Sequence, residues 1–238
     1  EIHSGDWSSD VCSSDLSKSK LELKIERVHQ RLTEAYGEPT REDSLSPLDQ
    51  LVNTILSQNT NDVNRDRAFQ QLRDRFPTWE AVRDAPTDAV IKAIRTAGLA
   101  NQKGPRIQGA LQRITEERGA LTLDFLADMP LKAAREWLTD IKGVGPKTAA
   151  IVLLFGLDRP AFPVDTHVHR VSRRMGLIDD NVSAAKAHEL LEARVPPKWY
   201  YSFHLNVIRH GRQICHARKP QCEDCVLNDL CDYYQRQE

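Results

Sequence analysis

The sequence predicts an all-α protein, and three observations support this class. Apolar residues recur at helical spacing along most of the chain. Gly and Pro residues punctuate these segments. Nowhere does a sustained alternation of apolar and polar residues indicate a strand. With 238 residues, 40% of them hydrophobic and 28% charged, the chain is long enough for one or two compact domains.

The N-terminal residues 1–16 differ from the rest. They are rich in Ser and Asp, lack helical periodicity, and lack the basic-then-apolar layout of a signal peptide. We interpret them as a disordered tail derived from adapter or cloning DNA, and Cys12 is set aside with them. The first helix is expected from Lys20 to Tyr36, with Gly37 ending it.

A second helix is predicted to begin at Ser46-Pro47, with Ser as its cap and Pro in its first turn. Its apolar stripe ends at a polar loop, Gln58 to Asp62, whose ordinary interpretation is helix capping. Further helices are expected over residues 61–76, 78–84, 87–97, 102–118, 131–140, 169–175, 183–193 and 200–215.

A helical hairpin is predicted around Gly143-Val144-Gly145, because Gly permits positive φ and Pro146 fits a first helical turn. Such a turn presents free backbone N–H groups beside the positive end of a helix dipole, where a phosphate binds well. Lys147 lies in the first turn of the second helix, and Asp165 follows a later Pro-flanked break. An amine and a carboxylate therefore flank one phosphate-binding turn.

The bulk charge does not indicate a nucleic-acid-binding protein, since the formal net charge is −1 and the pI is about 6.8. The distribution says more, because residues 193–222 contain no acidic residue. No apolar run approaches a membrane span, so we expect a soluble, cytoplasmic protein. Two basic clusters are candidate phosphate contacts: Arg170, Arg173 and Arg174, and then Arg194, Lys198, Arg209, Arg212, Arg218 and Lys219.

Near the C-terminus, four cysteines form a C-x6-C-x2-C-x5-C run, which can surround one metal centre. Disulfides are disfavoured because they rarely persist in the cytosol. Zinc modules more often use two close Cys pairs, yet spacing alone leaves zinc and an iron–sulfur cluster both open. The four residues are Cys215, Cys222, Cys225 and Cys231.

Two motifs together resemble the helix-hairpin-helix DNA glycosylase superfamily, and specifically its endonuclease III branch. One is the run Pro163-Val164-Asp165-Thr166-His167. The other is the hairpin pattern formed by Leu138, Ile141, Gly143, Val144, Gly145, Ala149 and Val152. The resemblance implies a six-helix barrel over residues 46–159. It also implies a discontinuous domain, residues 17–45 and 160–238, holding a [4Fe–4S] cluster on the four cysteines.

The resemblance also implies a reaction. The Lys147 amine would attack C1′ of the damaged nucleotide and form a Schiff base, and β-elimination would then cut the strand. Asp165 would stabilise the cationic sugar. The substrate would be double-stranded DNA with oxidised pyrimidines or abasic sites, acted on by a monomeric enzyme in the cytoplasm of a bacterium or archaeon. DNA contacts are expected at Gly143, Val144, Gly145, Thr148, His167, Arg218 and Lys219.

One position departs from the family pattern. The loop that enters DNA usually carries a glutamine, which here is replaced by Asn59 or shifted to Gln58. His169 is expected to be structural. Two alternative functions remain: a non-catalytic DNA-binding module, and a monofunctional mismatch glycosylase, whose members generally lack lysine at the position of Lys147.

Overall fold

The computed structural model describes residues 18–41 and 45–237. Within these ranges every regular element is helical and no strand occurs, which confirms the all-α prediction. The predicted tail, residues 1–16, lies outside the described residues. None of the described helices combines the length and the apolar character needed to cross a bilayer.

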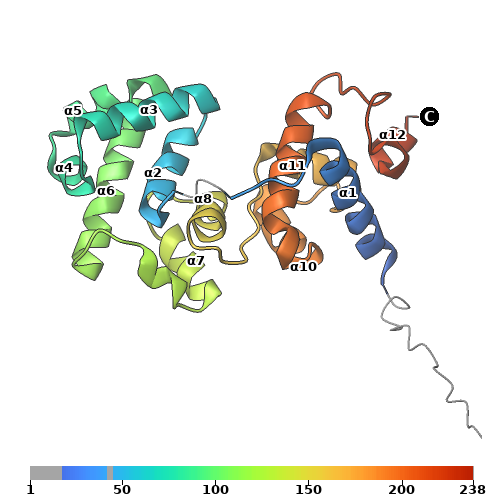
Figure 1. The fold of residues 1–238 in the computed structure, drawn as a ribbon, viewed down its shortest axis with the longest axis horizontal. Helices are drawn as coiled ribbons and strands as arrows, with labels where there is room; N and C mark the ends of the chain where they lie inside the picture. The colour runs from blue at the N-terminus through green and yellow to red at the C-terminus, as the bar shows by residue number, and fades with distance from the viewer. Residues whose placement is uncertain (1–17, 42–44, 238) are drawn as a thin grey trace, which may run out of the picture.

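The molecule has two lobes, and α8 (Pro146–Ile151) lies between them (Figure 1). The first lobe runs from α2 to α8, and its core includes the fully buried Leu51, Leu111 and Leu138. Its other helices are α2 (Pro47–Ser57), α3 (Asp62–Arg75), α4 (Trp79–Asp84), α5 (Thr87–Ala93), α6 (Ala100–Arg118) and α7 (Leu131–Thr139).

The second lobe joins the two ends of the chain. Helix α1 (Lys20–Tyr36) packs beside α11 (Tyr200–Gln213), and buried residues from both, such as Ile25 and Phe203, share one core. The Tyr36 hydroxyl and His210 Nδ1, 174 residues apart, lie 3.0 Å from each other. The lobe is completed by α9 (Thr166–Arg174), α10 (Ala184–Arg194) and α12 (Asp232–Gln235).

Local side-chain caps explain the starts of several helices. Ser19 and Glu22 form a reciprocal capping box on α1, and Ser46 caps α2 with Pro47 in its first turn. Helix α9 begins at Thr166, one turn before the predicted start at His169, because the Asp165 side chain caps it. The helix predicted over residues 87–97 is interrupted, and its end is a separate 3₁₀ turn, Arg95–Ala97.

Two contacts hold the lobes together near α8. Arg135 of α7 places one guanidinium nitrogen 2.8 Å from both carboxylate oxygens of Glu192 on α10. Arg212 of α11 lies 2.6 Å from the Asp62 carboxylate at the start of α3. Two ion pairs therefore connect the lobes.

Candidate functional site

The two hairpin glycines differ in backbone conformation and in the space around them. Gly143 adopts φ +88°, which favours glycine, and a Cβ there would come within 2.7 Å of Arg106 Cδ. Gly145 has φ −98° and extended backbone, so the expectation of left-handed backbone holds only at Gly143. A Cβ on Gly145 would meet nothing within 4 Å. Gly145 is exposed, so this open space lies on the solvent side of the residue.

The hairpin presents backbone donors at the start of α8. Among the described residues, the N–H groups of Gly145, Lys147 and Thr148 find no acceptor. The Thr148 side chain is buried, so only its backbone can face a ligand. Val144 was predicted to contact DNA, but its side chain lies in the core, and its N–H donates to the Ile141 carbonyl at 2.9 Å. Val144 therefore anchors the turn and offers no free N–H.

Lys147 and Asp165 flank the junction between the lobes. Lys147 is the second residue of α8 and is half-buried. Asp165 is also half-buried, and its Oδ1 accepts a hydrogen bond from the Val168 N–H at 2.8 Å. Both charges reach His204: burial lowers the pKa of this imidazole, the Asp165 carboxylate opposes that shift, and the Lys147 ammonium reinforces it. The amine and the carboxylate therefore act on a common region.

The backbone that leads to Asp165 is held by buried side chains from the second lobe. His188 Nδ1 lies 3.0 Å from the Phe162 carbonyl, and His204 Nδ1 lies 2.9 Å from the Pro163 carbonyl. Each contact requires a proton on Nδ1, because a carbonyl only accepts. Glu192 Oε2 accepts the Phe162 N–H at 2.9 Å. These residues are absent from the sequence prediction, because their partners are 26 to 41 residues away.

The residues of the polar loop after α2 have different roles. Asn61 caps α3 through the Asn64 N–H at 2.8 Å, as the ordinary interpretation predicts. Gln58 is engaged with the protein: its Nε2 donates to the Gly143 carbonyl at 3.1 Å, and its Oε1 accepts from Arg106 at 3.3 Å. Asn59 is exposed and has φ +51°. Asn59, rather than Gln58, is therefore free to contact another molecule.

A second exposed tip lies beside this loop. Leu99 is 46% exposed and has φ +48°, which is unusual for a branched apolar residue. Lys103 Nζ links the two segments by donating to the Leu56 carbonyl at 2.8 Å and to the Ala97 carbonyl at 2.7 Å. Leu99 was not among the predicted site residues, because its only local sign in the sequence is that it directly follows Gly98.

The two histidines after Asp165 are held within the protein. His167 Nδ1 lies 3.0 Å from an Arg170 guanidinium nitrogen, and burial lowers the pKa of its imidazole. A Cβ on Gly211 would lie 3.0 Å from His167 Cβ, so α9 and α11 pack closely here. His169 Nε2 donates to the Val182 carbonyl at 2.8 Å, in agreement with its expected structural role.

Two arginines of the basic cluster after Asp165, which were predicted to contact phosphate, bind the protein itself. Arg170 donates to the Cys215 and Gly211 carbonyls, and Arg174 donates to the His216 carbonyl at 2.7 Å. These two guanidinium groups secure the C-terminal loop and are not free for phosphate. Arg218 and Lys219, by contrast, are exposed in that loop and have no partner within the described part of the chain.

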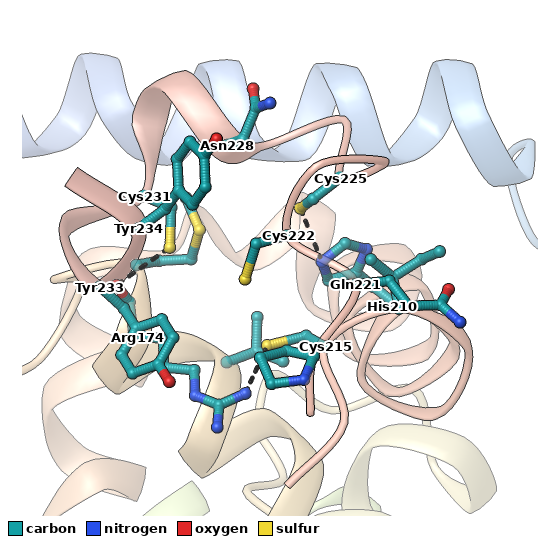
Figure 2. Close-up of a pocket in the computed structure, with 14 residues that line it drawn as sticks. Arg174, His210, Cys215, Gln221, Cys222, Cys225, Asn228, Cys231, Tyr233 and Tyr234 are labelled. Atoms are coloured by element: carbon teal, nitrogen blue, oxygen red, sulfur yellow. Dashed lines mark hydrogen bonds between the residues drawn. The ribbon is translucent and has the colours of Figure 1, made fainter. Parts of the chain in front are cut away.

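The four cysteines surround one cavity, into which their sulfur atoms point (Figure 2). All four are free thiols, which excludes the disulfide alternative. Across residues 18–41 and 45–237, no three His, Cys, Asp or Glu side chains converge tightly enough for one metal ion. Four thiols around one cavity are a ligand set that suits either zinc or an iron–sulfur cluster.

Protein groups around the cavity are arranged for thiolates. Arg174 Nη1 donates to Cys215 Sγ at 3.2 Å, and the Leu227 N–H donates to Cys225 Sγ at 3.4 Å. Burial raises the pKa of Cys231 and raises the pKa of Cys225 to about 11. Thiols in such surroundings lose their protons when a metal centre binds, so binding there releases protons.

Comparisons with known proteins agree with this geometry. Residues 52–197 match the model of the HhH-GPD superfamily base excision DNA repair proteins, and residues 215–231 match the iron–sulfur binding domain of endonuclease III. The chain is 35% identical over 183 residues to endonuclease III of Sulfolobus acidocaldarius, covering 76% of this chain and 79% of that protein.

Solved structures of DNA complexes are also similar. A non-covalent endonuclease III–DNA complex matches with a TM-score of 0.77 and 25% identity, covering 91% of this chain and 97% of that one. A trapped endonuclease III–DNA covalent intermediate matches with the same TM-score and identity, covering 91% and 98%. These findings, together with the hairpin and the cysteine cavity, settle the family.

The chain belongs to the endonuclease III branch of the HhH-GPD superfamily, and it is a DNA-binding base excision repair enzyme, a DNA glycosylase and AP lyase with a [4Fe–4S] cluster.

Proposed function

We propose that this enzyme removes oxidised pyrimidines from double-stranded DNA, with Lys147 as nucleophile and Asp165 as the carboxylate that assists it. The observation that carries the proposal is the placement of both side chains, half-buried, at one junction between the lobes. A junction of this kind is a common location for active sites. The free N–H groups of Gly145, Lys147 and Thr148 would hold a DNA phosphate beside it.

The damaged base must leave the duplex before Lys147 can reach C1′. We propose that Asn59 and Leu99 enter the DNA and fill the space that the base leaves. Both are exposed tips on left-handed backbone, and Lys103 joins the segments that carry them. One tip is polar and can hydrogen-bond to a base, and the other is apolar and can stack between bases.

The chemistry would then proceed from the Lys147 amine. Its lone pair forms a bond to C1′ as the glycosidic bond breaks and the base leaves with the bonding electrons. Opening of the sugar ring gives a Schiff base, and loss of a C2′ proton breaks the C3′–O bond, which cuts the strand. The Asp165 carboxylate would stabilise the positive charge that develops on the sugar. Asp165 would also keep capping α9 through the Val168 N–H.

The remaining assignments concern the whole protein. Cys215, Cys222, Cys225 and Cys231 would be the cluster ligands, and the cluster would order the loop that presents Arg218 and Lys219 to the DNA backbone. We assign residues 46–159 to a barrel domain and residues 17–45 and 160–238 to the cluster domain. We further propose that the enzyme acts as a monomer in the cytoplasm of a bacterium or archaeon.

Borohydride trapping tests the roles of the two residues. Wild-type protein should become covalently attached to a thymine-glycol duplex in borohydride, because reduction fixes the Schiff base. Lys147→Gln should bind the duplex but give neither trapping nor strand cutting. Lys142→Gln removes a lysine from the same hairpin and is the matched control, so it should trap normally. Trapping that persists in Lys147→Gln would assign the nucleophile to another amine.

Asp165→Asn separates base removal from strand cutting. Asn caps helices as well as Asp does, so the stability of α9 should be preserved. Base release from thymine glycol should slow strongly, whereas trapping on a pre-formed abasic site should continue, since no glycosidic bond remains to be broken. Equal failure on both substrates would instead assign Asp165 to the lyase step.

A further inference from the structure

Lys103 is a buried lysine with no acidic partner. Its side chain is 1% exposed, and no carboxylate pairs with it within the part of the chain that the structure describes. Burial lowers the pKa of its amine to about 8. A buried amine without a counter-ion is costly unless its N–H groups find acceptors, so the acceptors of Lys103 indicate what it does.

The two acceptors of Lys103 identify that role. The Leu56 carbonyl lies in the last turn of α2, three residues before Asn59, and the Ala97 carbonyl ends a 3₁₀ turn, two residues before Leu99. Neither carbonyl receives a backbone N–H from the described residues. Carbonyls at helix ends lack intrahelical partners and attract a cation. One amine therefore completes two helix ends, each of which leads directly to an exposed tip.

We propose that Lys103 is a positioning residue that fixes Asn59 and Leu99 relative to each other, so that both enter the DNA together. This inference rests on the proposed function of the two tips. Lys103 lies on α6, which supplies a rigid base for both segments. The next turn of α6 carries Arg106, which donates to Gln58 Oε1 at 3.3 Å and lies against Gly143. One face of α6 therefore reaches the two tips and the hairpin.

The amine of Lys103 is not a second nucleophile. It is buried, and both of its hydrogen bonds point to protein carbonyls. Even a neutral amine retains two N–H donors, which equals the number of acceptors present. The arrangement thus depends on the donors and on the length of the side chain.

The chain offers a matched control on the same helix. Gln108 is buried, and its amide donates to the Val82 carbonyl at 3.0 Å and to the Ala85 carbonyl at 2.8 Å. It therefore secures the end of α4 as Lys103 secures the end of α2, but neither acceptor leads to Asn59 or Leu99. Lys103→Met and Gln108→Leu each remove buried donors from α6, so both should lower the thermal stability.

Only Lys103→Met should impair entry into DNA. The probe is a duplex with tetrahydrofuran, a stable abasic-site analogue, opposite 2-aminopurine, whose fluorescence rises when it unstacks. Wild type and Gln108→Leu should raise the fluorescence on binding, and Lys103→Met should not. Affinity for undamaged duplex should stay within about twofold for both variants, because the hairpin phosphate contacts remain. Single-turnover base release from thymine-glycol duplex should fall about ten- to a hundredfold in Lys103→Met alone.

The outcomes separate this inference from the proposed function. If wild type releases no base from thymine glycol but unstacks 2-aminopurine, the assigned lesion is wrong and the fluorescence comparison still decides the role of Lys103. If Lys103→Met and Gln108→Leu give equal fluorescence and equal rates, Lys103 is only structural. A wild-type protein that leaves 2-aminopurine stacked would overturn the role of the tips and of Lys103 with it. Should Lys103→Met fail to fold, Lys103→Gln replaces it, with the same expected direction.

Discussion

At the scale of single residues, the two hairpin glycines, Gly143 and Gly145, are needed for different reasons. Gly143 is required by the protein, because its φ is +88° and Arg106 occupies the position of a Cβ. Gly145 is not required by the protein, because its φ is −98° and the adjacent space is open. The absence of a side chain at Gly145 therefore serves the approach of a ligand from outside.

The first prediction at this scale follows from that difference. Gly145→Ala should leave thermal stability nearly unchanged while weakening binding to damaged and undamaged duplex about equally, since phosphate contacts carry no sequence information. Gly143→Ala should lower stability by about 1 kcal/mol or more, because alanine is strained at positive φ. Thermal unfolding and duplex titrations measure the two effects. Normal DNA affinity in folded Gly145→Ala would show that DNA does not approach this position.

Sequence motifs identified Lys147 and Asp165 as candidate catalytic residues, but not the side chains that support them. Lys147 and Asp165 are marked by neighbours within a few positions, such as Gly145 and Pro163. No nearby motif identifies Lys103 or His204, because they have hydrogen-bond partners that lie 47 and 41 residues away in the sequence. Leu99 was missed for a similar reason, since its importance depends on its proximity to Asn59 in the fold.

At the scale of elements, the predicted helix bounds agree with the structure where nearby residues determine the helix ends, and they differ where distant packing does. The observed bounds of α1 agree with the approximate range predicted, because local residues specify both ends: Ser19 and Glu22 at its start and Gly37 at its end. The continuation of α8 as a π-helical turn, Val152–Gly156, was not predicted. A Cβ on Gly156 would come within 2.9 Å of Pro47 Cα, so this turn packs against the start of α2. Packing of that kind has no signature in a window of sequence.

The C-terminal loop carries the prediction at the element scale. Protein purified without oxygen should be brown and contain about four irons per chain. Cys225→Ser should lower the iron content and speed hydrogen exchange over residues 215–231, because the ligands order the loop. Non-specific DNA affinity should fall with it, since Arg218 and Lys219 lie in that loop.

Gln221→Ala is the matched control for this loop, because Gln221 lines the same cavity without offering sulfur. It should keep its iron and its protection from exchange. Zinc in place of iron and sulfide in wild-type protein would contradict the cluster. Unchanged exchange in iron-depleted Cys225→Ser would show that the loop is ordered without it.

At the scale of the whole molecule, the proposed roles of Lys147 and Asp165 require that the two lobes keep a fixed relative position. Arg135 and Glu192 span the lobes, and Glu192 also accepts the Phe162 N–H, three residues before Asp165. The pair is about three-quarters buried, with side-chain exposures of 25% and 23%. Removal of one partner is therefore costly, because the other charge would stay largely buried without its counter-ion.

The prediction here concerns removal of the link. Arg135→Met leaves a largely buried carboxylate without its cation, and should cost about 1–3 kcal/mol of the free energy of unfolding. Base release should slow more than DNA affinity falls, because the hairpin is unaffected. Lys132→Met, on the same helix with a longer pair to Glu136 at 3.9 Å, is the control. Equal urea midpoints for the two variants would show that the pair does not hold the lobes.

The pairing of α1 with α11 also determines when the protein can finish folding. Tyr36 contacts a residue 174 positions later. At ribosomal speeds the wait for that residue is roughly ten to thirty-five seconds. The apolar face of α1, with Ile25, Val28 and Leu32, has no native partner in this interval, while residues 47–156 can already assemble their own core. The second lobe can therefore complete its core only after the final helices have been synthesised.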